Sequence, residues 1–511
     1  MKSSRETSSG PARPALKVPQ SRLATTAWFF LAVVSCLWVY WLNGVPLIYE
    51  DTGIYLYLGN VFLETAGLLD ASGAGAAAEA ASTVGGEAGT RSDDGMVQAS
   101  RALAYGVFLV VVGLIFDYSA VVYLQAIALI LTVYIVCSAA LRAILTVMSG
   151  WQVTALMLVA ASLGSAPFYV AFLMPDIFAP ILILAVAGLA TLGRNMKLWE
   201  ICVLVALGAG TVPMHLSHLG IALGLIPVSV VAAWLTGGQR WWLAGLLAAL
   251  IASVGLLERV SFETAVEKGT DSEVVYVPYI TARLIVDGPG KEFLDEECPE
   301  IGLATCKLNE KLDRPSRLTA THITFGVGEE HGSFTLLSPE EQKQVANEQI
   351  KFLITLAKDR PLDLANAGIR NIVRQLRLVS IDHTIPTEST QRRVRTMFPE
   401  APQEWSDGFL AQSRKWLDSV STFHSWVYGI SGLALIGLIL MPRSRVPAQM
   451  RGLGVVILLG ILGNAILCGA LSQPADRYGA RVMFLLPAGV ALLLCTRYRV
   501  REPFRKPVLP A

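Results

Sequence analysis

Several apolar runs in the chain approach ~20 residues, the length that an α-helix needs to cross the ~30 Å of hydrocarbon in a bilayer. A helix satisfies its own backbone hydrogen bonds in hydrocarbon, so these runs favour helices over an open sheet. Charged residues make up only 16% of the 511 residues, against about 25% in soluble domains. The sequence therefore predicts an α-helical polytopic membrane protein.

We expect about ten transmembrane helices. They are assigned to residues 24–42, 118–141, 151–173, 176–193, 198–213, 215–235, 241–257, 424–441, 452–472 and 481–496. The apolar stretch Ser100–Phe116 is short, and it could either cross or lie at the outer surface. If it crossed, the later clusters of Arg and Lys would fall outside, against the positive-inside rule. We therefore expect a re-entrant or surface helix there, with both termini in the cytoplasm of a bacterial inner (plasma) membrane.

This topology divides the chain into five parts. They are a disordered cytoplasmic tail (1–23), an N-terminal transmembrane module (24–257) with its first external loop at 44–117, an extracytoplasmic domain (258–423), C-terminal transmembrane helices (424–497) and a cytoplasmic tail (498–511). The first external loop contains a low-complexity insert, residues 71–95, which has little to bury and should be mobile.

The extracytoplasmic domain is expected to be rich in α-helix. The motif Ser338–Glu341 combines a capping box with proline at the first helical position and predicts a helix that continues to about Lys358. A second helix, over about 362–378, would carry three arginines along one side. Residues 274–280 alternate weakly and indicate a short strand.

Charge and cysteine content narrow the possible functions. The net charge is +1, and no basic stripe or zinc-type spacing indicates a nucleic-acid partner. Of the seven cysteines, only Cys298 and Cys306 lie in the polar region, where the topology predicts an oxidising compartment and a disulfide between them. The alternatives are two free thiols or a metal site, but neighbouring histidines are absent. We expect no metal and no cofactor.

Polar residues gather at the outer ends of the predicted helices. These residues are Glu50 and Asp51 after the first span, Asp176 at the start of the fourth, His215 and His218 at the start of the sixth, and Asp476, Arg477 and Arg481 where the tenth begins. All six histidines also fall outside, and the inner ends carry only scattered Lys and Arg. This asymmetry predicts a site around Asp51, where a rigid helix end would hold a carboxylate beside lipid and open to water.

Each of these residues also has a purely structural interpretation. Asp51 could be a solvated loop carboxylate beside an interfacial aromatic belt, and Asp176 could be a helix N-cap. His215 and His218 share a helical face and could bond to backbone, or form half of a metal site. Two arginines one turn apart suit a lipid-linked phosphate, because guanidinium groups match phosphate oxygens, but they could instead pair with Asp476 and a loop carboxylate.

The order of these features resembles the GT-C superfamily of polytopic glycosyltransferases, including its family 39, as a divergent member. Asp51 follows the first span, and the stretch from Arg101 to Leu109 is similar to an "RPPLYPLFL" surface helix, although the prolines of that pattern are replaced. Residues 124–126 resemble "LQAL", and Arg477–Tyr478 with 485–487 resemble a late "RY..LP" element. The resemblance covers the layout of most of the chain.

The resemblance implies a transferase that moves a sugar from a polyprenyl-phosphate carrier to an extracytoplasmic glycan, lipid or protein. Asp51 would be the general base, and Asp176 is a candidate second acidic residue. Arg477, Arg481 and Arg101 would face the donor phosphate, and Glu50, His215 and His218 would contact substrate. The partners would be the lipid-linked sugar, membrane lipid and the acceptor.

Two other functions fit the same composition. A transporter or flippase for a lipid-linked sugar should have inverted repeats and polar residues near the bilayer midplane, and neither is evident here. A non-catalytic assembly protein of an envelope polysaccharide system would use the outer domain as a binding module. A single cavity shared by Asp51, Asp176, His215 and Arg477 would favour the transferase.

Overall fold

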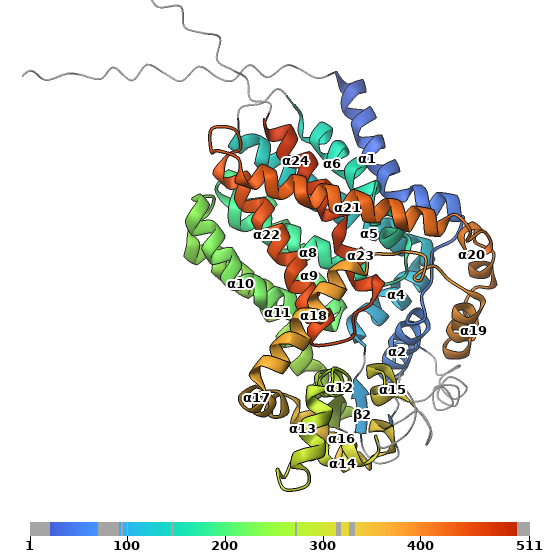
Figure 1. The fold of residues 1–511 in the computed structure, drawn as a ribbon. Coiled ribbons are helices and arrows are strands. Elements are labelled where there is room, and N and C mark those ends of the chain that lie inside the picture. Colours follow the sequence, from blue (N-terminus) through green and yellow to red (C-terminus); the bar gives the residue numbers. More distant parts are fainter. Residues whose placement is uncertain are drawn as a thin grey trace, which may run out of the picture.

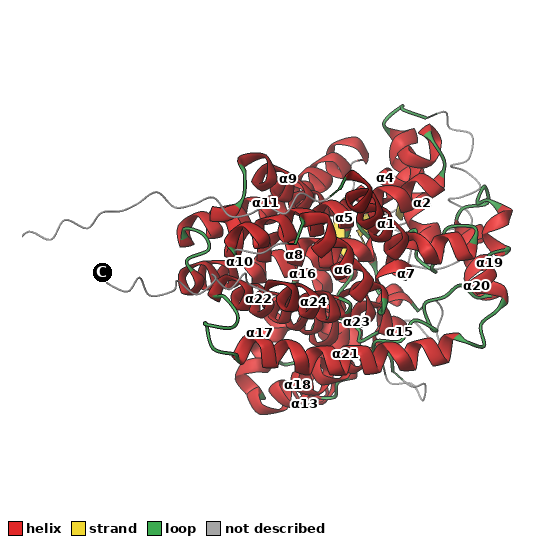
Figure 2. Cartoon of the chain, turned by 90° about the horizontal axis from the view of Figure 1, so that it is seen from above, coloured by secondary structure: helices red, strands yellow, loops and turns green. Residues whose placement is uncertain are grey.

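The computed structural model of the chain is almost entirely helical (Figures 1 and 2). It describes residues 21–69, 91–92, 96–99, 101–144, 148–270, 273–312, 318–326 and 333–497. The two expected tails, apart from residues 21–23, and most of the low-complexity insert lie outside these residues.

Eight of the described helical segments are long and apolar enough to cross a membrane, which indicates a membrane protein. They are α1 (Arg22–Asn43), α5 (Tyr118–Ala143), α8 (Phe178–Leu192) with its flanking 3₁₀ turns η1 (Pro175–Ile177) and η2 (Gly193–Asn195), α10 (Leu216–Thr236), α11 (Trp241–Thr270), α21 (Leu417–Leu440), α22 (Ala448–Ala465) with the π-helical turn η6 (Ile466–Ala470), and α23 (Asp476–Met483) followed by α24 (Leu485–Arg497). The segment around α8 is completely buried by the other helices, so it forms the centre of the bundle.

Two of the ten expected spans are not among the eight long segments. The expected span 151–173 is divided into α6 (Gly150–Ser162) and α7 (Ala166–Ala171), with Pro167 in the first turn of α7, where proline is tolerated because its missing N–H has no partner in the helix. The expected span 198–213 is α9 (Leu198–Thr211) followed directly by the 3₁₀ turn η3 (Val212–Met214). Its bounds agree with the prediction, but it belongs to the shorter apolar helices.

Two short helices lie beside the bundle where the first external loop was expected. They are α2 (Thr52–Thr65) and α4 (Leu103–Ile115), and they pack closely against each other. At 13 residues, α4 is about 20 Å long, which is too short for a perpendicular span. Its length agrees with a surface or re-entrant helix.

The polar region forms a second module with its own apolar core at one end of the bundle (Figure 1). Its helices are α12 (Tyr279–Val286), α13 (Pro289–Glu297), α14 (Thr305–Glu310), α15 (Ala320–Phe325), α16 (Pro339–Asn347), α17 (Gln349–Asp359) and the start of α18 (Pro361–Arg377). The last two helices of the polar region, α19 (Glu388–Met397) and α20 (Phe409–Gln412), pack instead against α2 and α1 of the bundle. α11 continues beyond the expected boundary at residue 257 into this region, and α21 begins before residue 424. The start of α1 and the end of α24 lie at the other end of the bundle (Figure 1).

A small sheet joins the segment between α2 and α4 to this module. The strands β1 (Arg91–Ser92), β2 (Met96–Ala99) and β3 (Glu273–Tyr276) lie in that order, with β1 antiparallel and β3 parallel to β2. The expected strand over 274–280 is therefore present only in its first half. Pairing of Met96 with Glu273 brings the residues just before α4 beside the end of α11.

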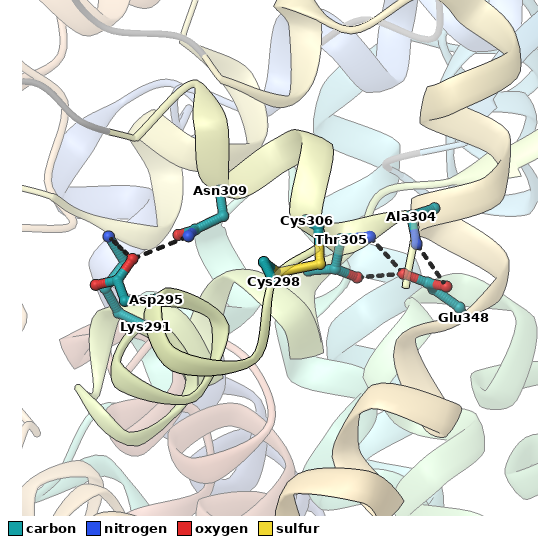
Figure 3. The surroundings of a disulfide bond; sticks show 8 residues. All are labelled: Lys291, Asp295, Cys298, Ala304, Thr305, Cys306, Asn309 and Glu348. Atoms are coloured by element: carbon teal, nitrogen blue, oxygen red, sulfur yellow. Dashed lines mark hydrogen bonds and ion pairs between the residues drawn. A yellow bond between two sulfur atoms is a disulfide. The ribbon is translucent and has the colours of Figure 1, made fainter. Parts of the chain in front are cut away.

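The predicted capping box at Ser338 is confirmed, but the helix does not continue to Lys358. It ends at Asn347 and a new helix begins at Gln349. Glu348, at the break, accepts hydrogen bonds from the backbone N–H groups of Ala304 and Thr305 at the start of α14 (Figure 3). The interruption therefore places a carboxylate where it satisfies the unpaired donors of another helix.

Cys298 and Cys306 form a disulfide that joins the end of α13 to α14 (Figure 3). We expect replacement of both by Ser to lower the free energy of unfolding of this module by about 2–3 kcal/mol, because the bridge restricts the unfolded chain over a separation of eight residues. Pulse proteolysis of the full-length protein in urea would measure the loss. The control is Cys202→Ser, which removes an exposed free thiol. Equal midpoints for the two variants would contradict the prediction.

Candidate functional site

A cavity of about 370 Å³ lies where the second module meets the end of the bundle. Its walls come from the segment between α1 and α2, the residue pair before α4, the start of α10, helices α12 and α15, and the stretch from η6 to the start of α23. Tyr55 of α2 and Arg393 of α19 also line it. Asp51, Arg101, His215 and Arg477 all line it. Of the four residues whose shared cavity would favour the transferase, Asp51, His215 and Arg477 therefore line one cavity, and Asp176 does not.

Asp51 lies at the centre of the ion pairs in this cavity. It directly precedes α2, and its side chain makes no capping hydrogen bond and is only 9% exposed. One carboxylate oxygen accepts from Arg101 at 2.6 Å, and the other accepts from Arg477 at 2.6 Å. The interpretation of Asp51 as a solvated loop carboxylate is therefore wrong.

The two guanidinium groups decide the charge of Asp51. Burial by itself would raise the pKa of the carboxyl, but Arg101 and Arg477 outweigh that effect and lower the pKa below its usual range. Asp51 is therefore ionised at neutral pH. In this state it is a weak base, because both oxygens are already occupied by strong donors.

A second ion pair lies behind the cavity wall. Arg481 is completely buried and donates to Asp176 at 3.1 Å, to Asn464 at 2.7 Å and to Ser217 at 2.9 Å. Asp176 lies within η1 and makes no N-cap bond, so its interpretation as a cap is wrong. Asp176 and Arg481 are not among the described residues that line the cavity. They are therefore better placed to hold neighbouring side chains in position than to touch a ligand.

Arg477 connects the two ion pairs. Its Nε atom lies 3.6 Å from Asp176, while its terminal nitrogen binds Asp51. The guanidinium also lies over the rings of Tyr49 and Tyr478, 4.8 Å from each centroid. These contacts fix the plane of the group. The alternative pairing with Asp476 is not formed, since Asp476 instead accepts from the backbone N–H of Ser380.

The helix pair α2–α4 sets the spacing between Asp51 and Arg101. The backbones touch at Gly59 and Gly106, and a Cβ on Gly106 would lie 2.4 Å from the carbonyl oxygen of Tyr55. Only glycine allows this approach. Gln125 of α5, in the motif at 124–126, accepts from the Tyr105 hydroxyl and donates to two carbonyls just before η1. It therefore ties α4 to the segment that carries Asp176.

The two predicted histidines lie close together, but only one reaches the cavity. His215 and His218 have ring centroids 5.2 Å apart. Burial and the neighbouring Arg481 keep the pKa of His215 well below its usual value, so the ring is neutral. Its Nδ1 accepts from the backbone N–H of Ser217, which leaves Nε2–H as a donor. His218 bonds to the carbonyl of Thr211 and does not line the cavity.

Among the described residues, no group of three or more acidic, His or Cys side chains is arranged to hold a metal.

The second module contributes cavity residues that the sequence did not reveal. Tyr279 of α12 accepts a hydrogen bond from Arg101 at 3.3 Å, and the ring of Phe325 lies 5.8 Å from the same guanidinium. Burial raises the pKa of Tyr279 to about 12, so its hydroxyl stays protonated. Glu50 also lines the cavity, with an exposed side chain. No motif surrounds Tyr279 or Phe325, so nothing in the sequence could have indicated them.

Fold and site together describe an α-helical membrane protein with a charged cavity at one end of its bundle. Comparison with protein-family models, with curated proteins and with solved structures returned no match to the chain. The function must therefore be argued from the cavity itself.

Proposed function

We propose that the protein is a membrane glycosyltransferase that moves a sugar from a polyprenyl-phosphate carrier to an acceptor outside the cytoplasm. The observation that carries this proposal is the position of Asp51, which is held between two arginines in a cavity at the ends of apolar helices. An ionised carboxylate beside anion-binding groups supplies what this reaction needs.

The charge of the cluster favours an anionic ligand. Its ion-paired members are Arg101, Arg477, Arg481, Asp51 and Asp176, which leaves an excess of one positive charge. Glu50 and Arg393 also line the cavity, and their opposite charges leave this excess unchanged. A polyprenyl-phosphate sugar carries one negative charge on its phosphodiester. Guanidinium forks bind such oxygens in two-point contacts, so Arg101 and Arg477 could hold the phosphate at the cavity wall.

The reaction follows from these positions. The acceptor hydroxyl attacks the anomeric carbon of the sugar and its proton passes to Asp51. The bond from the anomeric carbon to the phosphate oxygen breaks, and its electron pair leaves with the polyprenyl phosphate. Arg101 and Arg477 stabilise the second negative charge that develops on this leaving group. The neutral His215 can donate a hydrogen bond to a sugar hydroxyl, and Tyr279 can position the carrier.

Binding of the donor phosphate would also make Asp51 a stronger base. In the empty cavity both of its oxygens accept from arginine. A bound phosphate competes for the same donors, which weakens those ion pairs and raises the pKa of Asp51. The base would therefore become effective only when the donor is present.

Comparison of a deletion strain with its wild type tests the proposal. Mass analysis of surface glycans and lipid-linked sugars should show loss of one sugar from the envelope and accumulation of its polyprenyl-phosphate donor. Unchanged glycans and an unchanged donor pool would contradict a transferase. A donor that accumulates only on the cytoplasmic side would instead favour a transporter.

Replacement of Arg101 should weaken donor binding. We expect Arg101→Gln to raise the donor KM about 10- to 100-fold, since a hydrogen bond to a charged group contributes about 1.5–3 kcal/mol. Arg101→Lys keeps the charge without the fork and should have an intermediate effect. Steady-state assays with donor and acceptor varied separately would measure this. A rise in the acceptor KM alone would contradict the assignment.

A further inference from the structure

The helix α18 (Pro361–Arg377) buries polar side chains and exposes apolar ones, which is the reverse of a helix on the surface of a soluble domain. Its buried face contains the polar residues Asn371 and Gln375. Its exposed face contains Leu362, Ile369 and Val373, which are 77%, 60% and 41% exposed. In water such an arrangement would leave apolar surface uncovered.

Specific hydrogen bonds explain why the polar face is buried. The Asn371 amide donates to Asp287 at 2.6 Å. The side chain of Gln375 donates to the carbonyl of Ala475 at 2.9 Å and accepts from its N–H at 3.0 Å. The helix also touches η6, where a Cβ on Gly469 would lie 2.9 Å from the Asn371 carbonyl oxygen. These contacts fix which face of α18 points outward.

The exposed apolar residues share one side of the helix, with the exposed Asn366 between Leu362 and Ile369. Leu362, Ile369 and Val373 are separated by seven and four residues, so they lie along one side of the helix. Beside α18, the helix α17 exposes Ile350 and Ile354, four residues apart. Figure 1 shows α18 rising from α17 toward the end of α22.

A basic strip borders this face. Arg370, Arg374 and Arg377 are exposed and lie one turn apart, next to Ile369 and Val373 around the helix. An apolar face with a basic flank is the pattern of a helix that lies in a membrane interface. The flank complements anionic headgroups.

We propose that α18 lies in the interfacial layer of the membrane, with its apolar face among the acyl chains and its arginines at anionic lipid headgroups. The lipid surface is favoured over a protein partner because α18 packs directly on α22 and η6. These elements form one of the segments long enough to cross a membrane, and Leu462 and Ile466 are exposed there. The apolar surface of α18 therefore lies beside apolar surface that already requires lipid.

Spin labelling of the full-length protein in phosphatidylglycerol vesicles tests this placement. In a Cys202→Ser background, Ile369→Cys would carry the label on α18. The control is Lys311→Cys, at an exposed position just after α14 in the same module. We expect oxygen to reach the label at 369 far more readily than a water-soluble nickel chelate does, with the reverse order at 311.

Two results would overturn the proposal. One is equal access of the nickel chelate to both labels. The other is strong dipolar broadening between labels at 369, which would show that a second copy covers the face. The basic flank is tested by Arg370→Gln, Arg374→Gln and Arg377→Gln in the labelled protein. These changes should raise chelate access in phosphatidylglycerol and leave it unchanged in phosphatidylcholine, and no effect in either lipid would refute the role of the arginines. The measurements need no substrate and do not depend on the proposed reaction.

Discussion

Asp51→Asn should lower the rate of sugar transfer by about 10²–10⁴-fold or more, because an amide cannot accept the acceptor's proton. The amide also leaves Arg101 and Arg477 with less negative charge between them. The donor phosphate should therefore bind at least as tightly as before. Transfer assays on purified protein in vesicles, with donor binding measured separately, would show loss of turnover without loss of affinity.

Folding must be checked for this variant, since Asp51 balances two partly buried cations. Asp51→Glu keeps the charge and should restore the ion pairs while it displaces the base. The matched control is Asp117→Asn, the same change at an exposed N-cap that asparagine can also satisfy. Full transfer by correctly folded Asp51→Asn protein would end the assignment of Asp51 as the base.

Arg481→Met should cost about 3–5 kcal/mol of stability, the largest structural effect that we expect from one substitution. The side chain is 0% exposed and donates to Asp176, which is itself buried. Removal of the Arg481 guanidinium leaves the carboxylate of Asp176 buried among helices without its nearest positively charged partner. Equilibrium unfolding in mixed micelles would measure the loss.

A double variant separates the ion pair from simple packing. Asp176→Asn added to Arg481→Met removes the uncompensated charge and should recover part of the stability. Arg392→Met is the comparison, since its exposed pair with Glu388 should contribute at most about 1 kcal/mol. Losses that simply add for residues 176 and 481 would contradict a charge-based explanation.

The sequence was sufficient for the helical class and for the placement of Asp51, His215 and Arg477 at one end of the bundle. Long apolar runs have few stable structures in lipid, so α1, α5, α10 and α22 were found close to their true bounds. Charged groups at the ends of such runs are costly unless they pair, and this restriction brings Asp51 together with Arg477. The two residues could be placed together without a local sequence motif.

Features that depend on contacts between distant segments could not be found in this way. Tyr279 and Phe325 reach the cavity only because the second module folds over the bundle end. The division of the span 151–173 depends on a turn whose backbone is satisfied by Tyr428, more than 250 residues later, through a hydrogen bond from the N–H of Ser165. Hydrophobicity alone shows neither arrangement.

The contact between Gly59 and Gly106 has a consequence for how the protein can vary. Any side chain at either position must push the two short helices apart, and the carboxylate and guanidinium carried at their ends would separate with them. Two residues without functional groups therefore control the cavity as strictly as the charges do. A substitution at the exposed Glu50 changes one side chain of the cavity. A substitution at Gly59 or Gly106 instead requires the backbones of both helices to move.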